Sequence, residues 1–296
     1  MKRLLTLLLS MVLLTSCNAD EQQSDSTAAE TEKPAETETI ETAETESETE
    51  VTKNLSIAAL GDSITRGFGL ADVTGDRFTT LICDMLEEDG VSVKLANYGV
   101  DGITSGELLD ELEAGYYTAV RATDVVTLCI GANNILGAGF SFLEAYMTYE
   151  GDALTESYEQ FREEADAGVE TLRENLPVIL ETIRKLNPDC RIILLNLYNP
   201  YAHIDLSLNS IRFGMTIGSL TDEYIQKLNA ITESYADDNT GLVDVYGAFS
   251  GREADFIYAY AEDGKLVNVD PHPNADGHEM IADAVYNAEF TVYEEE

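Results

Sequence analysis

The sequence predicts an α/β fold in which a parallel sheet of about five strands carries helices on both faces. From Lys53 to Phe290, short apolar runs rich in β-branched residues alternate with longer segments whose apolar residues recur at helical spacing. No solenoid-like repeat and no linker-like stretch interrupts this region. Hydrophobic residues make up 44% of the 296-residue chain, which is enough for a substantial core. We therefore expect one domain.

The expected strands and helices alternate along the chain. Strands are expected at Leu55–Leu60, Val91–Ala96, Val125–Ile130, Arg191–Leu197 and Gly241–Val245, which are short segments rich in apolar residues. Helices are expected at Asp76–Glu88, Thr104–Glu113, Ser157–Leu186, Leu220–Tyr235 and Ala275–Phe290, where the period is that of a helix with one apolar face. Ligands bind at the carboxyl ends of the strands in such sheets, so the residues that follow each strand are candidate site residues.

Residues 1–17 indicate a lipoprotein signal peptide. Lys2 and Arg3 precede an apolar run, Leu4–Leu14, which is too short to span a bilayer but suits the core of a signal peptide. The run ends in Leu-Thr-Ser-Cys17, which resembles the lipobox of bacterial lipoproteins. The resemblance implies export, lipidation of the Cys17 thiol and anchoring to the outer face of the bacterial cell membrane. An ordinary secretory signal with an incidental cysteine is the alternative.

Residues 18–52 predict a disordered acidic tether ahead of a domain at 53–296. Thr, Glu and Ala dominate this segment, which has one proline and no aromatic residue, so it has too little apolar surface to offset the entropy of ordering. Its like charges favour an extended chain. The tether would hold the domain away from the membrane.

Charge and cysteine content exclude several classes of function. The net charge is −39; residues 18–50 contribute −11 and residues 1–17 contribute +2, which leaves −30 on residues 51–296. Such a field repels phosphate backbones, so no nucleic acid partner is expected. Cys83, Cys129 and Cys190 lie in apolar contexts without metal-ligand spacing and are expected to be small core residues. No metal or cofactor is expected.

The first expected strand ends in Gly61-Asp62-Ser63-Ile64-Thr65. This pentapeptide resembles the first block of the SGNH (GDSL-like) hydrolases, in which the serine is the nucleophile. The resemblance implies a three-layer flavodoxin-like fold and a serine esterase or acylhydrolase with Ser63 as nucleophile. Taken without the other blocks, the pentapeptide is also compatible with a simple strand-to-helix turn capped by Ser or Asp.

Two further segments resemble the blocks that form the family's oxyanion hole. Asn97-Tyr98-Gly99-Val100-Asp101-Gly102 follows the second strand, and by this resemblance the backbone N–H of Gly102 binds the oxyanion, where the lack of a Cβ permits close approach. Gly131-Ala132-Asn133-Asn134 follows the third strand, and the Asn133 side chain is implied as a second donor beside the Ser63 N–H. The family commonly has aspartate where this chain has Asn134, which puts that residue's supporting hydrogen bond in question.

The last resemblance is in Asp270-Pro271-His272-Pro273-Asn274, which precedes the final helix. His272 matches the general base and Asp270 the residue that orients its ring. The family usually places two residues between this aspartate and histidine, and here there is one; a backbone carbonyl that orients His272 is therefore an alternative to Asp270. The other two histidines are expected to be a loop residue, His203, which could line a pocket, and a partly buried helix residue, His278.

Three other functional interpretations were weighed against this one. An α/β-hydrolase needs a Gly-x-Ser-x-Gly elbow, which this chain lacks because Thr65 stands two residues after Ser63. A metallohydrolase needs a group of metal-ligating side chains, and the sequence offers no such group. A non-catalytic surface lipoprotein that binds carbohydrate or a protein partner on the same scaffold stays open because of the departures at Asn134 and Asp270.

The substrate class is left open by these motifs, since family members cleave acetylated carbohydrates, lysophospholipids, aryl esters and thioesters. Residues Leu136–Ser157 and His203–Thr221 are the candidate pocket walls or lids. A tether that places the domain towards the cell wall slightly favours carbohydrate or cell-envelope esters. The membrane is expected to be contacted through the Cys17 lipid only.

Overall fold

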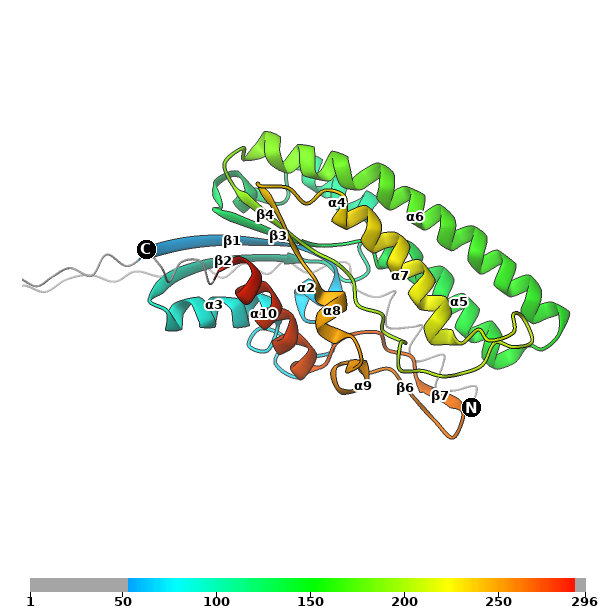
Figure 1. Ribbon diagram of the computed structural model, residues 1–296. Coiled ribbons are helices and arrows are strands. Elements are labelled where there is room, and N and C mark those ends of the chain that lie inside the picture. The colour runs from blue at the N-terminus through cyan, green and yellow to red at the C-terminus, as the bar shows by residue number, and fades with distance from the viewer. Residues whose placement is uncertain (1–52, 291–296) are drawn as a thin grey trace, which may run out of the picture. The chain divides into compact units, whose positions relative to one another are not determined.

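A computed structural model describes residues 53–290, which contain a five-stranded parallel sheet (Figure 1). The strand order is β2-β1-β3-β4-β5, the order of flavodoxin-like sheets. The expected α/β fold is confirmed. The expected signal peptide, Cys17 and the tether lie outside the described residues. The strands are β1 Lys53–Gly61, β2 Val91–Gly99, β3 Val125–Cys129, β4 Arg191–Leu195 and β5 Thr240–Val243.

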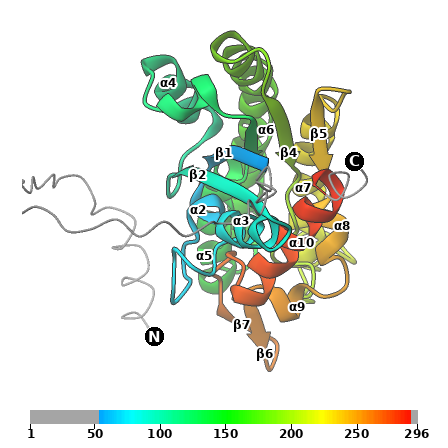
Figure 2. The same ribbon diagram turned by 90° about the vertical axis from the view of Figure 1, so that its left-hand side faces the viewer.

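Helices cover both faces of this sheet, as Figures 1 and 2 show. One face carries α3 (Phe78–Glu88) and α10 (Ala275–Glu289), which pack against each other. The opposite face carries α4 (Ser105–Ala114), α6 (Asp152–Leu186) and α7 (Ile217–Glu233), with α5 (Asn133–Thr148) packed on α6. This division follows from right-handed crossovers between parallel strands. Short elements complete the fold: α2 Ser63–Arg66, η1 Thr118–Ala122, α8 Val245–Phe249, α9 Glu253–Phe256, β6 Tyr260–Glu262 and β7 Lys265–Asn268.

The register of the central strands brings their carboxyl ends to one edge of the sheet. Gly61 at the end of β1 pairs with Gly99 of β2 and with Cys129 of β3. The segments that follow these three strands therefore emerge side by side. All five residues of β3 are buried, as expected for a strand covered on both faces.

One sequence expectation about secondary structure needs correction, and one helix was not expected. Part of Leu136–Ser157, the expected pocket wall or lid, belongs to α5, whose Gly-Ala-Gly stretch has low intrinsic helix propensity but packs against α6. Helix α6 begins at Asp152 rather than at Ser157 and continues through Pro177. In both places tertiary packing overrides the local preference.

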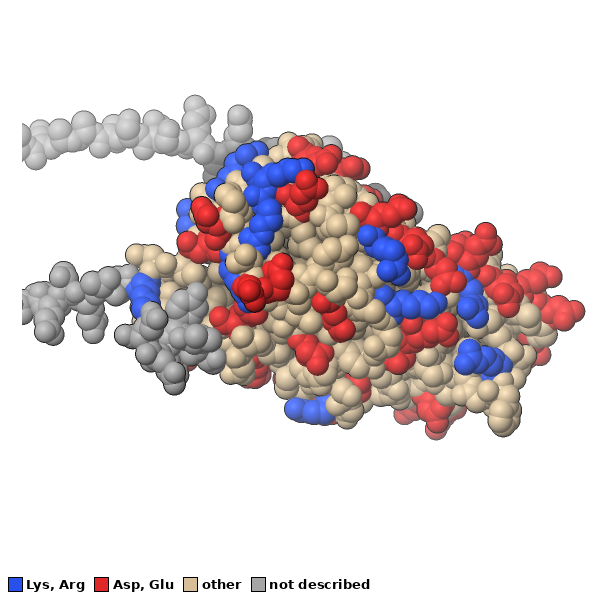
Figure 3. Space-filling model, turned by 45° about the horizontal axis from the view of Figure 1, so that its top comes forward, with Lys and Arg blue, Asp and Glu red and all other residues tan. Residues whose placement is uncertain are grey.

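Cys83, Cys129 and Cys190 are buried and free, which confirms their interpretation as small core residues. Acidic side chains are spread over the face shown in Figure 3, with basic side chains between them. Ion pairs join α6 and α7 on the surface, among them Lys227 Nζ to Asp166 Oδ1 at 2.8 Å. Of the helices within residues 53–290, none has the length and apolar character needed to cross a membrane.

Candidate active site

Ser63 lies directly after β1, at the start of the single-turn helix α2, and is 7% exposed. The preceding Gly61 is needed here because a Cβ at this position would overlap the carbonyl oxygen of Cys129 and the hydroxyl of Thr65. Asp62 caps the turn: its Oδ1 accepts the backbone N–H of Ile64 at 2.9 Å.

His272 and Asp270 meet Ser63 from the loop between β7 and α10. His272 Nε2 lies 2.8 Å from Ser63 Oγ, and His272 Nδ1 lies 2.6 Å from Asp270 Oδ1. The same Asp270 oxygen accepts the backbone N–H of His272 at 3.1 Å. The His272 side chain is 15% exposed, which leaves a path for a reacting group. A shorter spacing than the family's thus still brings the carboxylate to the ring, and the backbone-carbonyl alternative is not needed.

Two buried tyrosines hold the backbone of this loop. The Tyr198 hydroxyl donates to the carbonyl oxygen of Pro271 at 2.8 Å, and the Tyr201 hydroxyl donates to that of Val269 at 2.7 Å. Burial raises the pKa of both phenols, so both remain protonated donors at neutral pH. The aspartate–histidine segment is therefore fixed at the residues on either side of Asp270.

Gly102 and Asn133, the expected oxyanion donors, lie on the loops after β2 and β3. The β2 loop is joined to β1 by a hydrogen bond from the Val100 N–H to the Gly61 carbonyl at 3.0 Å. Gly102 has a φ of +76°, and a Cβ at this position would meet nothing within 4 Å. The left-handed backbone at Gly102 is a conformation that glycine adopts without strain.

The Asn133 side chain is already oriented by the protein. Its Nδ2 donates to the carbonyl oxygen of Ile103 at 3.1 Å and lies 3.4 Å from Asp62 Oδ2. An amide nitrogen carries two hydrogens. The contact with Asp62 is long, so the hydrogen that faces Asp62 is only weakly hydrogen-bonded. Asn133 lines the same pocket as Ser63 and His272.

Asn134, where the family commonly has aspartate, is fully engaged. Its Oδ1 accepts the backbone N–H of Ser105 at 3.0 Å, and its Nδ2 donates to Ser105 Oγ at 2.8 Å and to the carbonyl of Gly168 at 3.2 Å. The bond to Gly168 requires a donor, which a carboxylate lacks. Asn134 therefore ties the β3 loop to α4 and α6, and the departure from the family pattern does not loosen the loop that carries Asn133.

Asp62 is also a site residue. From the sequence it was expected only as a possible helix cap. It is 1% exposed, and burial raises the pKa of its carboxyl to about 6, with the hydrogen bond from Ile64 and the nearby His272 acting in the opposite direction. Its position directly before the nucleophile was visible in the sequence, but its burial was not.

The two remaining histidines take no part in this constellation. His203 Nε2 lies 2.8 Å from the carbonyl of Ala259, and the residue does not line the pocket. His278, expected to be partly buried, is fully buried on α10, where its Nδ1 accepts the Phe78 N–H at 3.3 Å. Burial lowers its pKa to about 4. Among the described residues, no three or more His, Cys, Asp or Glu side chains are grouped to hold a metal ion.

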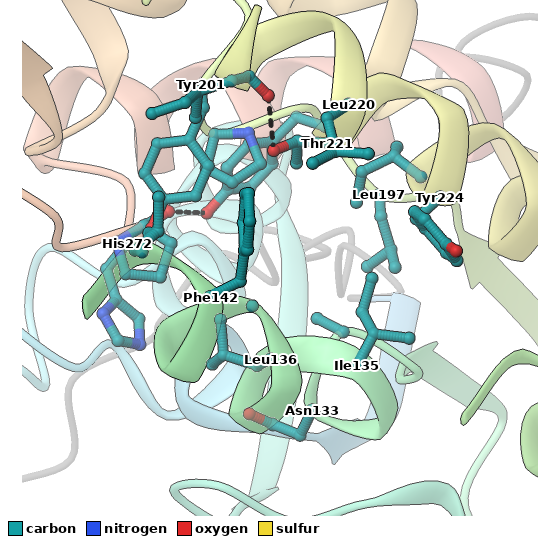
Figure 4. A pocket seen from close by; sticks show the side chains of 18 of the residues that line it. Asn133, Ile135, Leu136, Phe142, Leu197, Tyr201, Leu220, Thr221, Tyr224 and His272 are labelled. Carbon is teal, nitrogen blue, oxygen red and sulfur yellow. Dashed lines mark hydrogen bonds between the residues drawn. The ribbon is translucent and has the colours of Figure 1, made fainter. Parts of the chain in front are cut away.

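A pocket with a volume of about 100 Å³ begins at Ser63 and His272 and runs between α5 and α7 (Figure 4). Both segments expected to form its walls contribute, but only in part. The wall from α5 consists of Asn133, Ile135, Leu136, Gly139, Phe142 and Leu143. The wall from α7 consists of Ile217, Leu220, Thr221, Tyr224 and Ile225. Three lining residues were not expected from the sequence, because each has the appearance of an ordinary core residue: Phe161 on α6, and Tyr224 and Ile225 on α7.

Residues 59–280 match the model of the GDSL-like Lipase/Acylhydrolase family. This range extends from the end of β1 into α10 and contains every site residue described above. A relative among curated proteins is the uncharacterized protein YpmR of Bacillus subtilis (strain 168), which is 28% identical over 246 residues, or 81% of this chain and 84% of YpmR.

Two solved structures share the fold. The lipase Lip_vut3 from a goat rumen metagenome has a TM-score of 0.60 and 24% identity over 80% of this chain and 98% of its own. The phospholipase A1 from Streptomyces albidoflavus NA297 has a TM-score of 0.58 and 18% identity over 79% of this chain and 99% of its own.

Proposed function

The chain belongs to the GDSL-like lipase/acylhydrolase (SGNH) family and is a hydrolase that acts on ester bonds, and we propose that it does so through a Ser63–His272–Asp270 acyl-enzyme mechanism. One observation carries the proposal. The serine hydroxyl, both ring nitrogens and the carboxylate form an unbroken hydrogen-bonded series with distances of 2.8 and 2.6 Å.

Acylation follows from this geometry. His272 Nε2 takes the proton of the Ser63 hydroxyl while Ser63 Oγ forms a bond to the ester carbonyl carbon. Asp270 holds Nδ1–H, which leaves the unprotonated nitrogen facing Ser63 and stabilises the imidazolium that forms. When the tetrahedral intermediate collapses, the carbon–oxygen bond to the alcohol breaks and His272 returns the proton to the alkoxide that leaves.

The oxyanion of this intermediate needs preorganised donors. We assign this role to the backbone N–H groups of Ser63 and Gly102 and to the side chain of Asn133, which come from the three aligned strand ends. Deacylation repeats the sequence with water: His272 takes a proton from water, the hydroxide adds to the acyl carbon, and Ser63 leaves with the returned proton. The carboxylic acid is released.

The cellular position of this hydrolase is a second part of the proposal and rests on the sequence alone. Lys2, Arg3 and the apolar run before Cys17 favour export, and the lipobox-like sequence favours a lipid on the Cys17 thiol. The domain would then act at the outer face of the bacterial cell membrane. Mass spectrometry of the mature N-terminus tests this: a diacylglyceryl-modified Cys17 supports it, and an unmodified Cys17 or cleavage elsewhere overturns it.

The catalytic assignment is tested with p-nitrophenyl acetate and a purified Ser63→Ala variant. We expect kcat to fall by about four to six orders of magnitude, as it does when a triad nucleophile is removed. Ser141→Ala is the matched control, because Ser141 is exposed on α5 and lies outside the pocket lining. Near-wild-type turnover by Ser63→Ala would refute the assignment.

A further inference from the structure

The pocket between α5 and α7 also indicates a substrate class. We propose that it binds the acyl chain of a fatty acyl ester, and that Gly139 sets the length of chain it accepts. This inference rests on the proposed function, because it places the acyl group of the Ser63 intermediate in the pocket. It differs from the carbohydrate esters that the sequence slightly favoured.

Two apolar helix faces form the pocket. Along α5, the residues that line it recur at spacings of three and four, from Ile135 through Gly139 to Leu143. Along α7 the same spacing runs from Ile217 to Ile225. Such stripes normally pack against each other and exclude solvent. Here they leave a slot that follows α5 for roughly 15 Å from Asn133 to Leu143, at 1.5 Å per helical residue.

Apart from Ser63, the side-chain hydroxyls of the lining have their hydrogens engaged within the protein. The hydroxyls of Tyr198 and Tyr201 donate to the carbonyls of Pro271 and Val269. The Thr221 hydroxyl donates to the Ile217 carbonyl at 3.0 Å, one turn earlier in α7. A sugar hydroxyl both donates and accepts, so a sugar site usually offers several donors and acceptors, whereas the hydroxyls of this lining keep only acceptor lone pairs. An alkyl chain requires no donor or acceptor, and its burial against this lining is favourable.

Gly139 lies at the centre of the α5 stripe, one turn from Leu136 and Phe142 on either side. Figure 4 shows these two neighbouring side chains on α5 directed towards the pocket. A Cβ built on Gly139 meets nothing within 4 Å, although the residue lines the pocket. A side chain at this position would therefore enter the slot, and its absence keeps the slot open beyond the catalytic end.

The test measures kcat/KM of the full-length protein for p-nitrophenyl acetate, butyrate, hexanoate, octanoate and decanoate. We expect kcat/KM to rise with acyl length by about fourfold for each methylene buried in the pocket, up to an optimum. In Gly139→Phe we expect the optimum to move to a shorter ester and the octanoate-to-acetate ratio to fall at least tenfold. Gly139→Ala should give a smaller change in the same direction.

Gly137→Phe is the matched control. Gly137 lies on the same helix, a Cβ there also meets nothing within 4 Å, and the residue is exposed and outside the pocket lining. Its acyl-length profile should match that of the wild type. A profile shifted equally by both phenylalanine variants would overturn the role of Gly139.

Three further outcomes separate this inference from the function on which it rests. Ser63-dependent activity that is flat or falls with acyl length would overturn the acyl pocket and leave the esterase mechanism standing. The same result would follow if acetate esters of longer alcohols, and not longer acyl chains, were preferred. Loss of all Ser63-dependent hydrolysis, acetate included, would overturn the proposed function and the inference together.

Discussion

Asp270 reaches the His272 ring across one intervening residue, and its Oδ1 accepts both the ring Nδ1–H, at 2.6 Å, and the backbone N–H of the same histidine, at 3.1 Å. The intervening Pro271 has a restricted φ, and its carbonyl is held by Tyr198. A tight turn thus takes the place of the longer spacing that the family usually has.

This arrangement predicts the effect of Asp270→Asn. The amide retains the shape of the side chain but permits the wrong tautomer of His272, so we expect kcat to fall by about three to four orders of magnitude. Steady-state kinetics on p-nitrophenyl esters measures it. Asp276→Asn, an exposed change at the start of α10, should leave kcat unaltered. A small loss in Asp270→Asn would mean that the backbone around Pro271 orients His272 by itself.

Neighbouring asparagines predict two different defects. Asn133→Ala should lower kcat by about two to three orders of magnitude, because one oxyanion donor is lost, and should also lower the free energy of unfolding, because the Ile103 carbonyl loses its partner. Asn134→Ala should lower the free energy of unfolding by about 1–3 kcal/mol, because Ser105 and Gly168 lose their partners. Urea unfolding and kinetics on both variants separate the effects. Equal losses of activity at equal stability would contradict the assignment.

Asp62 predicts a stability that falls as pH rises. Its carboxyl has a pKa of about 6 in the folded protein against 3.8 ordinarily, so folding favours the protonated form. The stability contributed by this group is fully present below pH 3.8 and is lost as pH rises through 6, a change of about 3 kcal/mol.

The measurement compares wild type with Asp62→Asn, which keeps a side-chain oxygen for the Ile64 N–H. The difference in the free energy of unfolding between the two proteins should shift in favour of the variant between pH 4 and pH 8, by up to about 3 kcal/mol. A constant difference across that range would show that ionised Asp62 is not penalised by burial.

His278 predicts the opposite dependence. Its pKa is lowered to about 4 by burial and, to a smaller extent, by His272, so the folded protein favours the neutral ring. The corresponding stability is fully present above the ordinary pKa of 6.5 and is lost as pH falls through 4. NMR titration should show His278 ring signals of neutral imidazole down to about pH 5. Protonation near pH 6.5 would contradict the prediction.

The parallel sheet was predictable because its strands are short segments rich in apolar residues with helical segments between them, and the right-handed crossover rule restricts their order. The start of α6 and the extent of α5 were not, because their local sequence is ambiguous and each helix is stabilised by packing on the other. The short hairpin β6–β7 lacked a signal of comparable length.

The candidate site residues could be identified from short motifs that follow a strand or precede the last helix: Ser63, Gly102, Asn133, Asp270 and His272. The contact between Asp270 and His272, the partners of Asn134 and the burial of Asp62 could not, because each depends on distances that are set when the chain folds. The pocket, too, could not be predicted from the sequence. A helix sequence shows which face is apolar, but whether two such faces close on each other or leave a slot is decided by their separation in space.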